Sequence, residues 1–247
     1  GASFATQSLA ALVARSRAVV RAAPLAATLE QIAELERDLP AHVESIFDVA
    51  SVKAPVARAA AGLARFVGTH PIAGSERSGP QAARADLFAG RVWTYDACAS
   101  EPARTRAVAF VEAMGARPVA IASDEHDRIV ALTSHLPQIV SVALGAQLAP
   151  RRDDDAAVRA LCGTGMRSML RLAGSSWTVW EAVLLANAGP LAQEVRRLAD
   201  ILSGTAAALE TGASGELADR FARAAAAHGR LHANDSAPSD VFSSDER

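Results

Sequence analysis

The chain has 247 residues, of which 50% are hydrophobic and 21% charged, and its formal net charge is −2. This length is enough for one large domain or two modest ones that need no disulfide or metal support. Interspersed charges near neutrality exclude a nucleic-acid or anionic-membrane surface, and no apolar run approaches the length of a membrane span. Cys98 and Cys162 are far apart with no CxxC pairing, which argues against a disulfide framework or zinc site and indicates the cytoplasm.

The N-terminal stretch FATQSLAALVARS, residues 4–16, has the pattern of an amphipathic helix. No acidic residue precedes Glu30 and arginines are present, which is also typical of a transit peptide. The strand-like run that follows at residues 18–22 favours a folded element over a cleavable leader.

Short β-branched runs alternate with helical stretches through the first half of the chain. Strands are predicted at residues 18–22, 43–49, 65–68, 91–95 and 118–122, and helices at 26–37, 54–63 and 101–114. Strand-helix-strand alternation with short connections predicts a parallel sheet covered by helices. We therefore expect a partial Rossmann-like α/β domain over residues 1–122.

The second half of the chain has helical periodicity and no strand signal. Helices are predicted at residues 123–148, with a kink at Pro137, and at 154–161, 166–173, 177–188, 190–211 and 214–228. This pattern predicts an all-helical domain over residues 123–230, followed by a tail, 231–247, with the composition of a disordered segment. The predicted fold class is α/β plus all-α.

Ligands of open α/β sheets gather beyond the carboxyl ends of the strands. Pro24, Ser51, Lys53 and His70 follow three of the predicted strands, so we expect them at one edge of the sheet. A hydroxyl and an imidazole there suit proton transfer, although a structural Ser/His pair has the same spacing. Lys53 is the only lysine, so it either occupies a place where the arginine fork would not fit or is incidental.

Four segments together resemble prephenate dehydrogenases, in the order in which that family has them. They are FDVASVKAPV (47–56), GTHPIAGSERSGPQAARADLFAGRVW (68–93), HDRIVALTSHLPQ (126–138) and GTGMRSMLRLAGSSWTVW (163–180). The resemblance implies NAD- or NADP-dependent oxidative decarboxylation of prephenate or arogenate in tyrosine biosynthesis. It also implies a Rossmann domain for the cofactor and a helical domain that forms a homodimer.

The resemblance also implies the roles of individual residues. His70 corresponds to the histidine that accepts the proton of the substrate hydroxyl, Ser51 to the serine that orients it, and Arg171 to the arginine that binds the substrate carboxylate. The other expected substrate contacts are Ser75, Glu76, His126, Gln138 and Trp180. The expected cofactor contacts are Pro24, Ser51, Lys53 and Ser134. For His126 a solvated helix start and a dimer seam remain alternatives. His126 and His135 are nine residues apart, so no metal site is predicted.

The chain departs from the family pattern in three places. It has no G-x-G-x-x-G phosphate-binding turn, so the sequence does not distinguish NAD from NADP. Gln138 stands where the family often has a second histidine, and Ser168 stands where an acidic residue is usual. Arg21, in the strand predicted first, is interpreted either as a charge that protects a sheet edge or as a side chain that reaches solvent. Besides the dehydrogenase, two hypotheses remain: a non-catalytic relative that keeps the substrate pocket and dimer, and a structural dimerisation protein.

Overall fold

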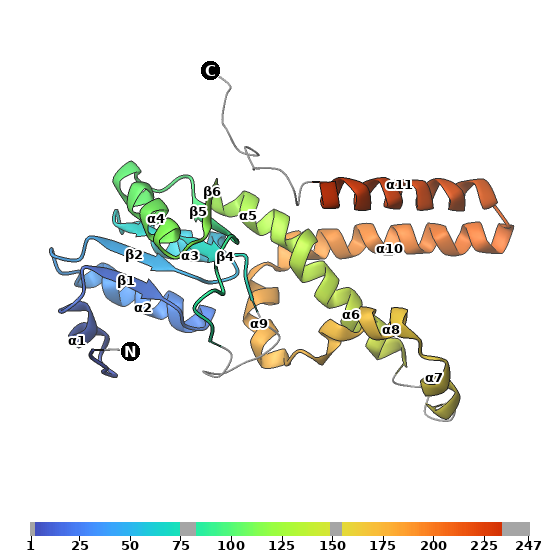
Figure 1. Cartoon of the computed structure of the whole chain (residues 1–247), viewed down its shortest axis with the longest axis horizontal. Coiled ribbons are helices and arrows are strands. Elements are labelled where there is room, and N and C mark those ends of the chain that lie inside the picture. Colours follow the sequence, from blue (N-terminus) through green and yellow to red (C-terminus); the bar gives the residue numbers. More distant parts are fainter. Residues whose placement is uncertain (1–2, 75–82, 149–154, 234–247) are drawn as a thin grey trace, which may run out of the picture. The chain divides into compact units, whose positions relative to one another are not determined.

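The computed structural model describes residues 3–74, 83–148 and 155–233. Its contacts divide the chain into two compact units, residues 1–188 and residues 189–247. Figure 1 shows strands interspersed with helices in the first unit and two long helices in the second. The predicted combination of an α/β region and a helical region is confirmed, whereas the boundary expected at residue 122 stays a prediction.

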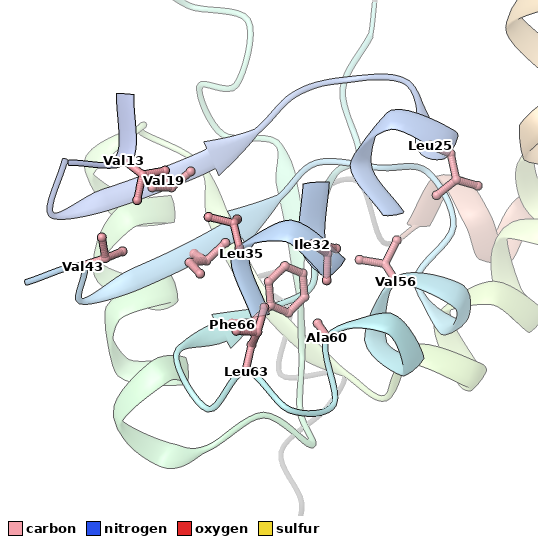
Figure 2. Close-up of a cluster of buried hydrophobic side chains, with 11 residues drawn as sticks. Val13, Val19, Leu25, Ile32, Leu35, Val43, Val56, Ala60, Leu63 and Phe66 are labelled. Carbon is pink, nitrogen blue, oxygen red and sulfur yellow. The ribbon is translucent and has the colours of Figure 1, made fainter. Parts of the chain in front are cut away.

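The first unit begins with a short helix and a three-stranded parallel sheet. Helix α1 is Leu9–Val13, the strands are β1 (Ala18–Arg21), β2 (Ser45–Asp48) and β3 (Phe66–Val67), and the connecting helices are α2 (Leu25–Arg37) and α3 (Ala54–Ala59). These elements share one apolar cluster, labelled in part in Figure 2: Val13, Val19, Leu25, Ile32, Leu35, Val43, Ile46, Val56, Ala60, Leu63 and Phe66. Burying each Val- or Leu-sized side chain contributes about 1.5–3 kcal/mol, so this cluster holds the helices against the sheet.

Arg21 fits neither of the two interpretations given from the sequence. Arg21 is the last residue of β1 and is only 8% exposed. Its charge therefore neither protects a solvated edge of the sheet nor reaches solvent. Burial lowers the pKa of Arg21, and the nearby charge of Glu34 partly opposes that shift. The strand therefore has a buried cation at its carboxyl end.

A second three-stranded sheet follows, and it is only partly parallel. It contains β4 (Thr69–Pro71), β5 (Val92–Asp96) and β6 (Arg117–Ile121) in the order β4-β5-β6, with α4 (Glu101–Ala113) between β5 and β6. β5 and β6 are parallel, but β4 pairs with β5 in the antiparallel direction. The sequence analysis missed β4, and its expectation of a purely parallel sheet was wrong here. The antiparallel pairing brings His70 opposite Thr94.

The region predicted as one kinked helix comprises α5 (Ser123–Val130), a π-helical turn η2 (Ala131–His135) and α6 (Leu136–Leu148). The backbone N–H of Leu136 donates to the carbonyl of Ala131, the wider i−5 spacing of a π turn. Pro137 lacks an N–H, and its ring conflicts with the carbonyl four residues earlier, so a wider turn at this point accommodates it. The irregularity expected at Pro137 is thus present immediately before it.

By length and composition the run from Ser123 to Leu148, 26 residues with a mean hydropathy of 1.5, is able to cross a membrane. This corrects the statement that no apolar run approaches such a length. The run nevertheless buries polar side chains against other elements of the first unit, among them His126, Asp127 and Gln138. That pattern is typical of a core helix, because charged groups facing lipid are costly.

The remaining helices of the first unit are short, and those of the second are long. The first unit continues with α7 (Asp155–Leu161), α8 (Thr164–Met169), a 3-10 turn η3 (Arg171–Gly174) and α9 (Trp177–Ala186). The helix predicted at 166–173 is thus two elements, and Arg171 begins the second. The long helices are α10 (Ala188–Thr211) and α11 (Ser214–Ala233), joined at Gly212, whose φ of +67° suits glycine.

Candidate active site

Three side chains from two elements form a continuous hydrogen-bonded chain in the first unit. His70 lies in β4, and its Nδ1 is 2.9 Å from Nε2 of His126 in α5. Nδ1 of His126 is 2.8 Å from Oδ1 of Asp127. His126 and Asp127 are 2% and 3% exposed, whereas His70 is half-buried. The arrangement leaves Nε2 of His70 as the atom at the open end of the chain.

Burial changes the protonation of His70. Loss of solvent is the largest cause that lowers the pKa of His70 to about 3, and the charges of His126, Lys53 and His135 lower it further. The imidazole is therefore neutral at working pH, because its pKa lies well below neutrality. A neutral imidazole has one nitrogen lone pair, which is what a proton acceptor needs.

Asp127 is fixed by the backbone at the start of α3. Its Oδ1 accepts the N–H of Lys53 at 2.7 Å, and its Oδ2 accepts the N–H of Ala54 at 2.8 Å. The first N–H groups of a helix have no partner within the helix, so a carboxylate is well placed there. Asp127 thus joins α5 to α3 and sets where His126 lies.

Lys53 is occupied in the interior. Its ammonium pairs with the Asp48 carboxylate and donates to the carbonyl of Thr69 at 2.6 Å, and its side chain is 3% exposed. Burial lowers the pKa of Lys53, and the Asp48 charge and hydrogen bond oppose that shift. These contacts explain why a lysine occupies this position, because a compact ammonium fits between Asp48 and Thr69. The explanation needs no contact with a cofactor. The cofactor contact expected of Lys53 does not follow from this arrangement.

Asp48 also fixes the residue before His70. Its Oδ1 accepts the backbone N–H of Thr69 at 2.9 Å, and the Thr69 hydroxyl donates to the Asp48 backbone carbonyl. The indole N–H of Trp93 in turn donates to that hydroxyl at 2.9 Å. The backbone N–H, the carbonyl and the hydroxyl of Thr69 are therefore all hydrogen-bonded, which fixes the start of β4 and the position of His70.

A second layer of polar contacts lies behind His126 and Asp127. The amide nitrogen of Asn187 donates to the backbone carbonyl of Asp127 at 2.8 Å and lies 3.1 Å from Nδ1 of His135. The His135 ring packs edge-on against Trp180, with 6.0 Å between ring centroids. Burial lowers the pKa of His135. Trp180 thus belongs to the same network as His70, through intermediate residues.

Arg171 lies on an exposed part of the first unit. It begins η3 and lines a shallow hollow together with the following residues: Leu132, Leu136, Pro137, Val140, Ser168, Met169 and Leu172. Gln138, 2% exposed, donates from Nε2 to the carbonyl of Leu172 at 2.9 Å, so it holds η3 to α6. The structure therefore connects Gln138 to the turn that carries Arg171. His70 is not one of the described residues that line this hollow.

The other predicted site residues are less closely connected. Ser51 is half-buried after β2, and none of the hydrogen bonds given for the described residues joins it to His70. Pro24 is exposed at the N-terminus of α2, and Ser134 is exposed in the π turn. Ser75 and Glu76 lie outside the described residues. Their roles, and that of Ser51, stay predictions.

Asp127, Asn187 and Asp48 were not predicted as site residues. The signal for Asp127 was available, because Ser123, His126, Asp127 and Val130 are spaced i, i+3, i+4 and i+7 and all face inward. The alternative of a solvated helix start for His126 is wrong, since both ring nitrogens of His126 have protein partners. Asn187 has no comparable signal, because its partners Asp127 and His135 are distant in sequence.

Comparison with known proteins identifies the family. Residues 1–119 match the nucleotide-binding domain of prephenate dehydrogenase, and residues 122–223 match the prephenate dehydrogenase dimerization domain. The chain is 38% identical over 176 residues to the "probable prephenate dehydrogenase NovF" of Streptomyces niveus, covering 68% of this chain and 48% of that protein. It is 31% identical over 181 residues to prephenate dehydrogenase of Bacillus subtilis, covering 71% and 49%. The chain thus spans about half the length of the curated relatives it matches.

Solved structures agree on the fold. Prephenate dehydrogenase from A. aeolicus, solved with hydroxyphenyl propionate and NAD+, superposes with a TM-score of 0.81 at 23% identity over 92% of this chain and 80% of that one. Arogenate dehydrogenase from Synechocystis gives a TM-score of 0.77 at 23% identity over 89% and 81%. The hydrogen-bonded residues Asp127, His126 and His70 end at the HPIAG segment. Because both of its halves match this family in order, the chain belongs to the prephenate dehydrogenase family.

Proposed function

We propose that this chain acts in the NAD(P)-dependent oxidative decarboxylation of prephenate or arogenate, with His70 as the proton acceptor. The observation that carries the proposal is the state of His70: a neutral, half-buried imidazole whose Nδ1 contacts His126 and whose Nε2 has no partner among the described residues. A base for a substrate hydroxyl needs an available lone pair at a fixed position. The relatives named above, all prephenate or arogenate dehydrogenases, support this reaction class.

In the proposed reaction the ring carbon that bears the hydroxyl loses a hydride, and the hydroxyl proton passes to Nε2 of His70. The ring carboxylate leaves as carbon dioxide, and the ring becomes aromatic. Aromatisation supplies the driving force, so His70 needs only to hold the hydroxyl and take its proton. NAD or NADP, when bound, supplies the hydride acceptor.

The described residues fit one side of a dinucleotide site. Pro24 and Ser51 follow the carboxyl ends of the neighbouring parallel strands β1 and β2, where such ligands bind. The glycine-rich turn that would hold the pyrophosphate is not in the sequence given. The nucleotide-binding description of the first family, and the NAD+ of the A. aeolicus structure, support a nicotinamide cofactor without distinguishing NAD from NADP.

Arg171 is the proposed anchor for a substrate carboxylate. A guanidinium binds a carboxylate through two parallel hydrogen bonds, which fixes both position and orientation. The hollow around Arg171 is lined mostly by apolar side chains, such as Leu132 and Met169, and these suit the ring of the substrate. Trp180, in the network of His135, is a further proposed contact.

Homodimer formation through the helices is also part of the proposal. Large apolar side chains are exposed on α9, α10 and α11, and they include Trp177, Val179, Leu185, Leu202, Leu209 and Phe221. Exposed apolar side chains in this number favour burial against a partner. The match to a family described as a dimerization domain supports a second copy as that partner.

The proposal is tested by titrating the protein with prephenate, arogenate, NAD and NADP, each alone and in pairs, and by following reduced cofactor. We expect saturable binding of one ring substrate and cofactor reduction only when both are present. Binding of the ring substrate with no binding of either dinucleotide would instead favour the non-catalytic relative. Binding of neither class would contradict both.

A further inference from the structure

We infer that His126 and Asp127 hold His70 in a single tautomer and share the proton that His70 accepts, so that three side chains act as one base. The inference rests on the role proposed for His70 and adds two residues to it. It assigns His126 a positioning role that acts through His70. This replaces the direct substrate contact expected from the sequence.

The tautomer follows from the hydrogen-bond partners of Asp127. Both backbone groups that contact its carboxylate are donors, the N–H of Lys53 on Oδ1 and the N–H of Ala54 on Oδ2. A carboxylate surrounded by donors is an acceptor, so the contact from Nδ1 of His126 at 2.8 Å is also a donated N–H. With His126 in its neutral form, the form that this inference assigns to it, the other nitrogen has no proton, so Nε2 of His126 is an acceptor.

The same reasoning continues to His70. Nε2 of His126 lies 2.9 Å from Nδ1 of His70, and because Nε2 accepts, Nδ1 of His70 donates. Nε2 of His70 is left with a lone pair. The contacts of one carboxylate therefore determine, across two rings, which nitrogen of His70 takes a proton. A carboxylate that sets the tautomer of a catalytic histidine is an established device in enzymes.

The two hydrogen bonds also provide a place for positive charge. When Nε2 of His70 gains the hydroxyl proton, the proton on its Nδ1 moves along the hydrogen bond to Nε2 of His126. The imidazolium then lies on His126, whose Nδ1–H contacts the Asp127 carboxylate. No electron pair is lost or gained by the protein. After aromatisation the extra proton returns by the reverse steps to Nε2 of His70 and from there to the oxygen of the aromatic product, which would otherwise be left as a phenolate. The charge therefore rests beside an anion that is 3% exposed.

The surroundings of His70 explain why this sharing is needed. Among the described residues, the charged and titratable groups that act on the pair are Lys53 before α3, Asp127 in α5 and His135 in η2. Asp48, at the end of β2, pairs with Lys53. On β5, the Thr94 hydroxyl donates to the His70 carbonyl at 3.2 Å. Burial and nearby cations lower the pKa of His70, so a proton held on His70 alone is disfavoured. Transfer toward Asp127 removes that disadvantage.

The resemblance implies that Ser51 orients the catalytic histidine, and the structure gives that contact to His126. Within the described part of the chain, Nδ1 of His70 pairs with Nε2 of His126. Ser51 is half-buried after β2, on the side where the proposed cofactor contacts lie. In this structure the contact that can orient His70 therefore comes from an imidazole that is itself held by a carboxylate.

The first test needs no variant and no turnover. Long-range ¹H–¹⁵N spectra of the histidine rings in the ligand-free protein report which nitrogen carries the proton. We expect His70 and His126 both to be neutral with the proton on Nδ1 near pH 7. A His70 ring with its proton on Nε2, or rapid exchange between the two tautomers, would overturn the inference even if His70 proves catalytic.

The second test separates orientation from proton sharing. His126→Gln places an amide near His70 but has no second nitrogen to pass a proton to Asp127, and we expect kcat to fall by about 10²-fold, a typical general-base contribution. The pH dependence of kcat should shift, while the Kd for prephenate stays within about twofold. His42→Gln is the control, because it makes the same substitution at an exposed histidine whose Nε2 lies 3.2 Å from the Val13 carbonyl, outside the network of His70. It should leave the His70 tautomer unchanged.

The two proposals fail in different ways. If wild-type protein turns over neither ring substrate, the proposed function fails, while the tautomer measurement still decides the orienting part of this inference. If His126→Gln folds and retains wild-type kcat and pH dependence, proton sharing is wrong and His70 acts alone. Folding is checked by the unfolding midpoint of each variant in urea.

Discussion

The Nδ1 atom of His70 lies 2.9 Å from the Nε2 atom of His126, although 56 positions separate the two residues in sequence. The contact joins a strand of the second sheet to the helix that follows it. It gives His70 a fixed partner on one nitrogen and leaves the other nitrogen for a ligand. The account of this protein depends on that asymmetry.

Replacing Lys53 with Met should destabilise the protein strongly. The substitution leaves the Asp48 carboxylate, which is fully buried, without its cation, and breaking a buried pair in this way costs about 3–5 kcal/mol. Urea unfolding measures the loss. Lys53→Arg should not rescue stability, because the guanidinium fork does not fit between Asp48 and Thr69. The double variant Asp48→Asn with Lys53→Met should recover part of the loss, and a Lys53→Met protein as stable as wild type would contradict the account.

The free energy of unfolding should decrease as the pH falls below about 6. The pKa of His70 is about 3 in the folded protein and near its ordinary value of 6.5 when unfolded, so the unfolded chain binds the proton first. Stability due to this group is complete above the unfolded pKa and is lost between the two values, at up to about 1.4 kcal/mol per pH unit. His135, whose pKa is also lowered, acts in the same direction.

The variant His70→Asn isolates the contribution of His70 to this pH dependence. Urea unfolding of wild type and variant at pH 7 and pH 5 should give a smaller difference between the two pH values for the variant. The absolute stability of the variant is also changed by the lost contact with His126, so only the difference between pH values is compared. Equal slopes for the two proteins would show that His70 is not held neutral.

Replacing Arg171 with Lys should weaken binding of the ring substrate by about tenfold or more. Lysine keeps the charge but offers no planar fork, so bidentate binding of the carboxylate is lost. Calorimetric titration with prephenate measures the change in Kd. Arg167→Lys is the matched control, because Arg167 precedes η3, is exposed and donates to the Cys162 carbonyl. Equal effects of the two substitutions would remove Arg171 from the substrate site.

Replacing Phe221 with Glu should shift the protein from dimer to monomer with little loss of monomer stability. Phe221 is 78% exposed in the isolated chain, so its ring contributes little to the fold of that chain. A charge at the centre of an apolar interface is costly, whereas the same charge on a free surface is not. Sedimentation velocity measures the change. A dimer that is unaffected by this charge would place the interface elsewhere.

Much of the fold followed from periodicity, because hydrophobic spacing reports local structure. The strand at 18–21 and the helices at 25–37 and 101–113 lie within one residue of their predicted bounds. β4 was missed because it is three residues long, ends in a proline and exists through antiparallel pairing with β5, which is a tertiary contact. The π turn was expected only as a kink at Pro137. Hydrophobic periodicity does not show whether a helix bends or forms a π turn next to a proline.

The candidate site was predictable to the extent that it depends on single residues. His70 and Arg171 were identified through the resemblance, and the structure supplies what spacing does not: the contact of His70 with His126 and the hollow that Arg171 lines. His126 was noticed, but its contact with His70 spans two elements whose packing the sequence does not encode locally. Lys53 was singled out as the only lysine, and its partner Asp48 could be found only by folding the chain.

The most direct test of the account is the turnover of wild type and His70→Asn with prephenate or arogenate and either dinucleotide. The account predicts that the variant binds the ring substrate with a Kd within a few-fold of wild type and forms reduced cofactor at least about 10²-fold more slowly. A variant that forms reduced cofactor at the wild-type rate would show that His70 does not accept the proton.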